Sequence, residues 1–156
     1  MLVSGSDQEE LERLCREQGD RMWRSVLAFA GDPEVAKDAV AEAFAQALRR
    51  GDELRDPERW LWRTSFRIAS GELKERGRRA AVVPEGSYEM EESARELMEA
   101  LRKLSEKQRM AVVLHHAAGY PVREVAAIIG STSAAVRVHL MRARRRLREL
   151  LEDDDG

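Results

Sequence analysis

Residues 122–151, VREVAAIIGSTSAAVRVHLMRARRRLRELL, decide the fold of the C-terminal half of this chain. Apolar and small side chains recur there at spacings of three and four, which predicts two helices, 122–129 and 133–151. Only Gly130-Ser131-Thr132 separates them. Two helices joined by so short a glycine-containing turn are typical of a helix-turn-helix, whose second helix enters the major groove of DNA.

The second of these helices has an apolar seam and a basic side. Val136, Leu140 and Ala143 continue the seam, and Thr132 is placed to cap the helix. An arginine on the basic side would address guanine edges or phosphates with paired hydrogen bonds. An amphipathic surface helix with a solvated basic face is the alternative. Residues expected to point away from the core are Ser133, Arg137, His139 and Arg142.

Start and stop signals divide the rest of the chain into further helices. Helices are predicted over 6–30, 33–50, 57–76, 93–104 and 105–118. Their start signals are the capping boxes Ser6-x-x-Glu9 and Ser105-x-x-Gln108 and the pairs Asp32-Pro33 and Asp56-Pro57; glycines follow most of them. No alternating pattern of useful length predicts a strand. We expect an all-α protein of two small domains, 1–79 and 93–151, with a flexible acidic linker over 80–92 and an acidic tail over 152–156.

Charge is segregated along the chain although the total is nearly balanced. The 156 residues carry 27 Lys and Arg against 29 Asp and Glu, a net charge of −2. Six arginines stand against one acid between 133 and 151, whereas six acids stand against one base between 82 and 99. Such segregation predicts two faces of opposite sign, one suited to a polyanion.

Several classes of protein are disfavoured by what the chain contains. The single cysteine, Cys15, cannot form an internal disulfide, and its place beside an apolar stripe predicts a small core residue. No apolar run approaches the roughly 20 residues of a membrane span, so we expect a cytoplasmic protein with no membrane insertion. Adjacent His115 and His116 point about 100° apart on a helix, and His139 has no ligand partner at metal spacing. We therefore expect no metal, no cofactor and no enzymatic activity.

The predicted helix 57–76 carries a basic stripe beside an apolar one. Trp62, Phe66, Ala69 and Leu73 form the apolar stripe, as aromatic residues at helical spacing usually do in a core. Trp60 lies at the edge of the basic side, where it would be able to stack an unpaired base. The basic residues of the stripe are Arg59, Arg63, Arg67, Lys74 and Arg78.

The order of these motifs resembles the extracytoplasmic-function (ECF) class of bacterial RNA polymerase sigma factors over nearly the whole chain. The C-terminal match is the more specific one. It comprises Leu101-x-x-Leu104-Ser105-x-x-Gln108-Arg109, Gly119, Glu124-Val125-Ala126, Gly130, Val136 and Arg142-Ala143-Arg144-x-x-Leu147. The N-terminal match comprises Gly31-Asp32-Pro33, 38–44 and Trp60-Leu61-Trp62-Arg63.

The resemblance implies a region 2-like domain and a region 4-like domain with three surfaces. Core polymerase docking, on the beta-prime clamp helices, would use Asp38, Glu42, Phe44 and Gln46. Recognition and melting of the minus-10 element would use Arg59, Trp60, Arg63, Arg67, Lys74 and Arg78, with the loop 51–57 capturing a flipped base. Recognition of the minus-35 element would use Arg123, Ser133, Arg137, His139, Arg142 and Arg144. The beta flap and an anti-sigma factor are further partners that the resemblance implies.

Some positions depart from the family pattern. Arg67 and Gly71 stand where the family often has Asn and then Asp, and Ala41 stands where glutamine is common in the docking motif. Pro121 replaces the usual Ser or Thr cap. Two alternatives stay open on the sequence: a sigma-like mimic that sequesters an anti-sigma factor without initiating transcription, and a stand-alone helix-turn-helix regulator.

Overall fold

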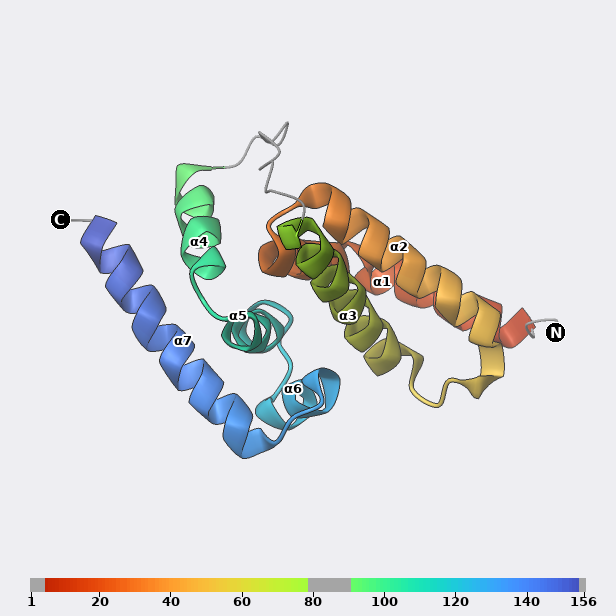
Figure 1. Cartoon of the computed structure of the whole chain (residues 1–156). Coiled ribbons are helices and arrows are strands. Elements are labelled where there is room, and N and C mark those ends of the chain that lie inside the picture. The colour runs from red at the N-terminus through yellow and green to blue at the C-terminus, as the bar shows by residue number, and fades with distance from the viewer. Residues whose placement is uncertain (1–4, 79–90, 155–156) are drawn as a thin grey trace. The chain divides into compact units, whose positions relative to one another are not determined.

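The described residues form two helical units. The structure, a computed structural model, describes residues 5–78 and 91–154. They divide into compact units that belong to 1–81 and 82–156 (Figure 1). No strand occurs in the described ranges, and the all-α class predicted from the sequence is confirmed. Most of the predicted linker lies outside these ranges, but its last residue, Glu92, is helical.

The first unit consists of three long helices. They are α1 (Gly5–Ala30), α2 (Pro33–Arg50) and α3 (Pro57–Arg78), with the short 3-10 helix η1 (Gly51–Glu53) between α2 and α3. Each of the three long helices packs against the other two. Two predicted ends were wrong: α1 begins before Ser6, which therefore lies within the helix, and α3 continues two residues past Arg76.

Aromatic residues from α1 and α3 fill the core of this unit. Phe29 and Phe66 pack with ring centroids 5.3 Å apart, and Trp62 stacks on Phe66 at 6.4 Å. The indole Nε1 of Trp62 donates a 3.0 Å hydrogen bond to Oε1 of Gln18, which satisfies a polar atom of a buried side chain. Trp62 and Phe66 of the apolar stripe predicted for helix 57–76 are thus confirmed as core residues.

Small buried residues allow α2 to pack closely against α1 and α3. Its fully buried side is made of alanines, and so short a side chain lets helices approach closely. The stripe consists of Ala36, Ala39, Ala43 and Ala47. The rest of the α2 circumference carries its polar groups together with half-buried Phe44 and exposed Leu48.

The expectation for Cys15 was wrong. Its neighbour Leu14 is buried, but the Cys15 side chain is exposed. Residues 14 and 15 are separated by about 100° around the helix, so only one of two adjacent residues can face the core squarely.

The second unit contains the predicted helix-turn-helix. Its elements are α4 (Glu92–Arg102), α5 (Glu106–Val112), the π-helical turn η2 (Val113–Ala117), α6 (Val122–Ile129) and α7 (Ser133–Asp154). The capping box at Ser105 is present, because its hydroxyl accepts from the Gln108 backbone and the Gln108 side chain accepts from the Ser105 backbone. The single helix predicted over 105–118 is therefore an α-helix that ends in a π-turn, and α4 stops at Arg102, short of the predicted 104.

The turn between α6 and α7 is closed by two local signals. Gly130 adopts a left-handed conformation, with φ of 70°, and its N–H bonds to the Ala126 carbonyl. Thr132 Oγ1 then accepts a 3.1 Å hydrogen bond from the Ala135 N–H, which confirms its capping role. Val125 of α6 and Val136 and Leu140 of α7 are all buried, so the apolar seam fixes how the two helices cross.

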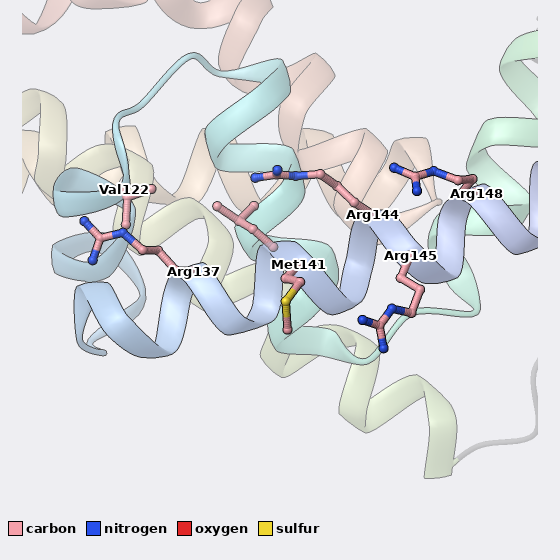
Figure 2. Close-up of a pocket in the computed structure, with 7 residues that line it drawn as sticks. Val122, Arg137, Met141, Arg144, Arg145 and Arg148 are labelled. Atoms are coloured by element: carbon pink, nitrogen blue, oxygen red, sulfur yellow. The ribbon is translucent and has the colours of Figure 1, made fainter.

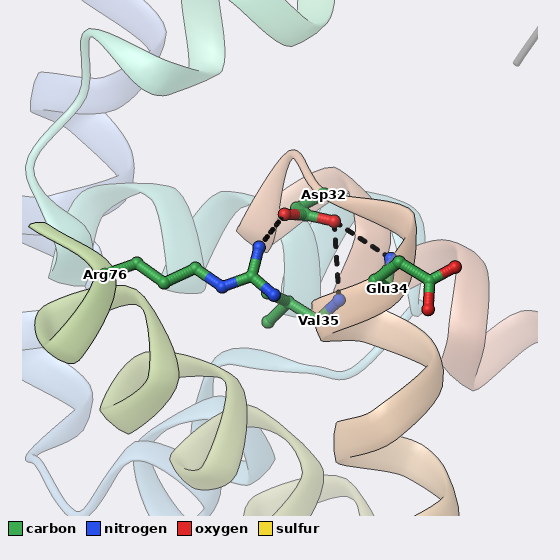
Figure 3. Close-up of polar contacts among 4 residues, drawn as sticks. All are labelled: Asp32, Glu34, Val35 and Arg76. Carbon is green, nitrogen blue, oxygen red and sulfur yellow. Dashed lines mark hydrogen bonds and ion pairs between the residues drawn. The ribbon is translucent and has the colours of Figure 1, made fainter. Parts of the chain in front are cut away.

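One long-range polar contact joins the start of α2 to the end of α3. Asp32 caps α2 by accepting from the N–H groups of Glu34, at 2.9 Å, and Val35. Its other carboxylate oxygen pairs with the Arg76 guanidinium of α3 (Figure 3). Asp32 is buried, and both of its carboxylate oxygens accept hydrogen bonds from these partners.

Two substitutions of Asp32 distinguish its role as a helix cap from its role in the ion pair with Arg76. We expect Asp32→Ala to lower the free energy of unfolding of the first unit by about 1–2 kcal/mol, because the cap is lost. Asp32→Asn keeps a good cap and loses only the charge, so it should cost less than Asp32→Ala. Urea unfolding followed by tryptophan fluorescence measures this unit alone, since all three tryptophans lie at 23, 60 and 62. Equal losses in the two variants would contradict the separation of the two roles.

Candidate functional site

The outward side of α7 is an arginine-rich surface. Arg137, Arg142 and Arg144 are exposed, as predicted. Together with Arg145 and Arg148 they make no side-chain hydrogen bond or ion pair with another described residue, in contrast to Arg146, which pairs with Glu149 at 3.5 Å. Guanidinium groups held on a rigid helix without internal carboxylate partners are suited to bind an external anion.

Other residues predicted for this surface lie nearer the core. Ser133 and His139 are half-buried, on opposite flanks of the seam formed by Val136 and Leu140. The Arg123 side chain, on α6, is 85% exposed, with its Nε 4.0 Å from the neighbouring Glu124. The structure therefore brings the arginines together and leaves Ser133 and His139 at the edges.

An open groove runs along α7 beside these arginines. Its volume is about 550 Å³, and Figure 2 shows Arg144 and Arg148 projecting from one side of the helix and Met141 and Arg145 from another. The sequence prediction did not include Met141, Arg145 and Arg148. Their positions at the outer side of a 3.6-residue period were the signal that would have found them. The groove is lined by Val122, Arg137, Leu140, Met141, Arg144, Arg145 and Arg148.

The π-turn before α6 carries two histidines. His115 Nδ1 lies 2.7 Å from the Tyr120 carbonyl, a contact that closes the connection to α6. Burial lowers the pKa of His116, and the charges of His115 and Arg144 lower it further. His115 thus has a structural contact, whereas the His116 side chain is exposed. The described residues contain no group of three or more potential metal ligands.

The basic stripe of α3 is present on one side of the helix. Arg67 and Lys74 are exposed, whereas Arg59 and Arg63 are half-buried. The Nε atom of Arg63 is buried and has no hydrogen-bond partner in the described chain. The side chain of Arg78 lies outside the described residues.

Trp60 lies at the edge of this stripe, next to the turn that η1 forms. It is half-buried, and the Arg50 guanidinium at the end of α2 lies 5.5 Å from its ring centroid. That distance is within the range of a cation–π interaction. Arg50 is a residue that sequence reasoning missed, because the contact joins two helices across a turn.

The acidic side of α2 is exposed and internally bonded. Glu42 Oε1 accepts from Gln46 Nε2 and from Arg49 Nη2, both at 3.1 Å, and these bonds lower the pKa of Glu42. Asp38 is exposed one turn earlier, whereas Phe44 is half-buried about 200° around the helix from Glu42. Three of the four predicted docking residues therefore share a side, and Phe44 lies on another.

None of the described helices has the length and apolar character needed to cross a membrane.

Comparison with known proteins gives both the class and the family. Residues 94–147 match the family model described as Sigma-70, region 4. An RNA polymerase sigma-E factor of Streptomyces antibioticus is 30% identical over 94% of this chain and 87% of its own length. The ECF RNA polymerase sigma factor BldN of Streptomyces coelicolor is 28% identical over 91% of this chain and 60% of that protein.

Solved structures show the same fold. The sigma factor RpoE, in complex with the anti-sigma factor NepR from Bartonella quintana, has a TM-score of 0.76 at 22% identity, covering 92% of this chain and 98% of that chain. CnrH, in complex with the cytosolic domain of CnrY, has a TM-score of 0.75 at 24% identity, over 94% and 90% of the two chains.

The helix-turn-helix and its arginine surface define a protein of the DNA-binding class that the sequence predicted. The chain belongs to the ECF class of RNA polymerase sigma factors. It is thus a factor for promoter-specific initiation of transcription.

The pKa of His116 tests whether its ring lies close to the Arg144 guanidinium of α7. Because the fold disfavours the charged ring, the unfolded chain binds more protons, and stability falls as the pH drops below 6.5 toward the lower folded pKa. We expect Arg144→Gln to raise the pKa of His116 by removing a nearby positive charge. NMR titration of the His116 ring measures this pKa. Arg142→Gln, which makes the same charge change elsewhere on α7, is the control. An unaltered His116 titration in Arg144→Gln would contradict the placement.

Proposed function

We propose that the three surfaces divide the work of a sigma factor among α2, α3 and α7. The observation that carries the proposal is the row of outward arginines on α7, Arg137, Arg142, Arg144, Arg145 and Arg148, which have no carboxylate partner among the described residues. The chemistry of RNA synthesis belongs to the polymerase in this proposal, and the chain has no catalytic residues and no cofactor of its own. It works in the cytoplasm, where its polymerase and promoters are.

In this proposal α7 binds the minus-35 element. Arg137 and Arg142 contact base edges, and Arg144 and Arg123 contact phosphates. Ser133 and His139 lie at the half-buried edges of the interface. Such a division gives sequence recognition to the start of α7 and general affinity to the arginines around it.

The basic side of α3 binds the minus-10 element in its melted form. Arg59, Arg63, Arg67, Lys74 and Arg78 follow the backbone of the single strand. Trp60, with Arg50 over one ring face, offers a stacking surface beside η1 to an unpaired base. Anion binding would also give the buried Nε of Arg63 a partner.

Docking on core polymerase is assigned to the exposed acidic side of α2. Asp38, Glu42 and Gln46 face a basic partner surface, the beta-prime clamp helices, while Phe44 contributes an apolar contact from the adjacent side. The beta flap binds the second unit. An anti-sigma factor is a further proposed partner, supported by the complexes in which RpoE and CnrH were solved.

Run-off transcription tests the proposed function as a whole. Core polymerase is incubated with fragmented genomic DNA of the host, with and without this protein, and transcript starts are mapped. New starts that share two spaced upstream elements are expected. Core binding without new starts would favour the sigma-like mimic, and sequence-specific DNA binding without core binding would favour the stand-alone regulator.

The docking surface is tested by reversing its charge. We expect Asp38→Lys together with Glu42→Lys to abolish association with core polymerase, because two attractive contacts become repulsive. Gel filtration of the mixed proteins measures it. The matched control is Glu9→Lys with Glu17→Lys on α1, which makes the same charge change at two exposed positions of the same unit. Retained association of the α2 variant would move docking elsewhere.

The recognition surface is tested by truncating two arginines. Arg137→Ala with Arg142→Ala should weaken promoter binding by the holoenzyme at least about 30-fold and leave core binding intact, since each of the two base contacts contributes about 1–3 kcal/mol. Arg95→Ala with Lys103→Ala removes the same charge from exposed positions outside α7 and serves as the control. Unchanged promoter binding in the α7 variant would refute the assignment.

A further inference from the structure

The centre of the outward side of α7 is apolar. Val138 is 39% exposed and Met141 is 51% exposed, and they are two of the four large apolar side chains that the described chain leaves exposed. At about 100° per residue, both lie on the side opposite the buried Val136 and Leu140. Exposed Ala134 precedes Val138 by one turn and Met141 by two.

Arginines flank this apolar strip on both sides. Arg137 and Arg142 are about 140° apart around the helix, and Ala134, Met141 and Val138 fall between them. Arg145 continues the strip at its far end and projects from the same side as Met141 (Figure 2). The apolar strip is thus flanked by guanidinium groups that have no anionic partner among the described residues.

Helix stability does not account for Val138. Valine has a lower helix propensity than arginine or alanine, and neither exposed side chain is buried by the fold. Neighbouring exposed apolar residues with a charged border mark a binding surface. The border is positive, so the occupant is a polyanion that also presents an apolar group.

Duplex DNA has one such group in its major groove. The base edges there carry hydrogen-bond donors and acceptors, and the 5-methyl of thymine is the only apolar substituent. A Met or Val side chain set against a polar base edge would leave donors or acceptors unsatisfied. Against a thymine methyl, the same side chain buries apolar surface on both partners.

We propose that Val138 and Met141 are specificity-determining residues of the minus-35 interface and that they select thymine by its methyl group. The inference rests on the proposed function of α7 and adds the base that its central strip selects. Arg137 and Arg142 supply hydrogen bonds and charge from the flanks, and small Ala134 lets the helix backbone approach the groove.

The test begins with duplexes that the holoenzyme selects from a randomised library. We expect at least one thymine in the selected minus-35 element. Each thymine is then replaced in turn by deoxyuridine, which removes only the methyl group. Wild-type holoenzyme should bind the uracil duplex about fourfold more weakly at one or two positions, which corresponds to roughly 0.8 kcal/mol for a buried methyl-sized group.

Variants of α7 assign this difference to the strip. Val138→Ala with Met141→Ala should bind the thymine and uracil duplexes equally, whereas Met141→Leu, which keeps an apolar side chain, should retain most of the difference. Arg137→Ala should weaken both duplexes alike and keep their ratio. Circular dichroism and core binding verify that each variant is folded.

Three results would overturn the inference. They are a selected element without thymine, indifference of the wild type to every uracil, and an undiminished thymine-to-uracil ratio in the double alanine variant. In the last case, unaltered DNA binding would assign the strip to a protein partner instead. A holoenzyme that selects no sequence at all would overturn the proposed function of α7 and this inference with it.

Discussion

A narrow buried stripe on α2 and another on α7 are the constraint on which the rest of the structure depends. On α2 the stripe is made of alanines, and on α7 it is made of Val136, Leu140 and Ala143. Close packing along so narrow a stripe holds a helix firmly and leaves most of its circumference in solvent. The acidic side of α2 and the arginine side of α7 both occupy the circumference that this packing leaves open.

The two exposed sides carry opposite charges because their proposed partners differ: core polymerase for α2 and DNA for α7. The arginine-rich helix α7 is offset by acidic segments elsewhere in the chain, such as 82–99, so the total charge of −2 conceals the basic surface. The two helices differ in whether their exposed charged groups have hydrogen-bond partners within the protein. On α2, Glu42 accepts hydrogen bonds from Gln46 and Arg49, whereas the arginines on the outer side of α7 have no such partners within the part of the chain that the structure describes.

Local signals predicted the helices well, because a cap or stop is a property of a few consecutive residues. Asp32-Pro33, Gly51, the capping box at Ser105 and the Gly130 turn all act as expected. The contacts that sequence reasoning missed join residues far apart. Asp32 pairs with Arg76 across 44 positions, and no periodicity of either helix indicates that the two ends meet. Cys15 was assigned to the wrong side because an apolar stripe defines its edges only to within one residue.

The outer side of α7 shows why the content of an interface is harder to predict than its existence. Arginines are conspicuous in a sequence, so the basic side of 133–151 was evident, whereas apolar Val138 and Met141 were not assigned to that side although the seam was predicted. Once Val136 and Leu140 are known to be buried, both fall on the opposite side. Phosphate contacts give affinity for any duplex, whereas contacts with base edges distinguish one sequence from another. An apolar centre within a ring of arginines combines the two: the ring holds the helix in the groove, and the centre responds to the one apolar group that a base presents there.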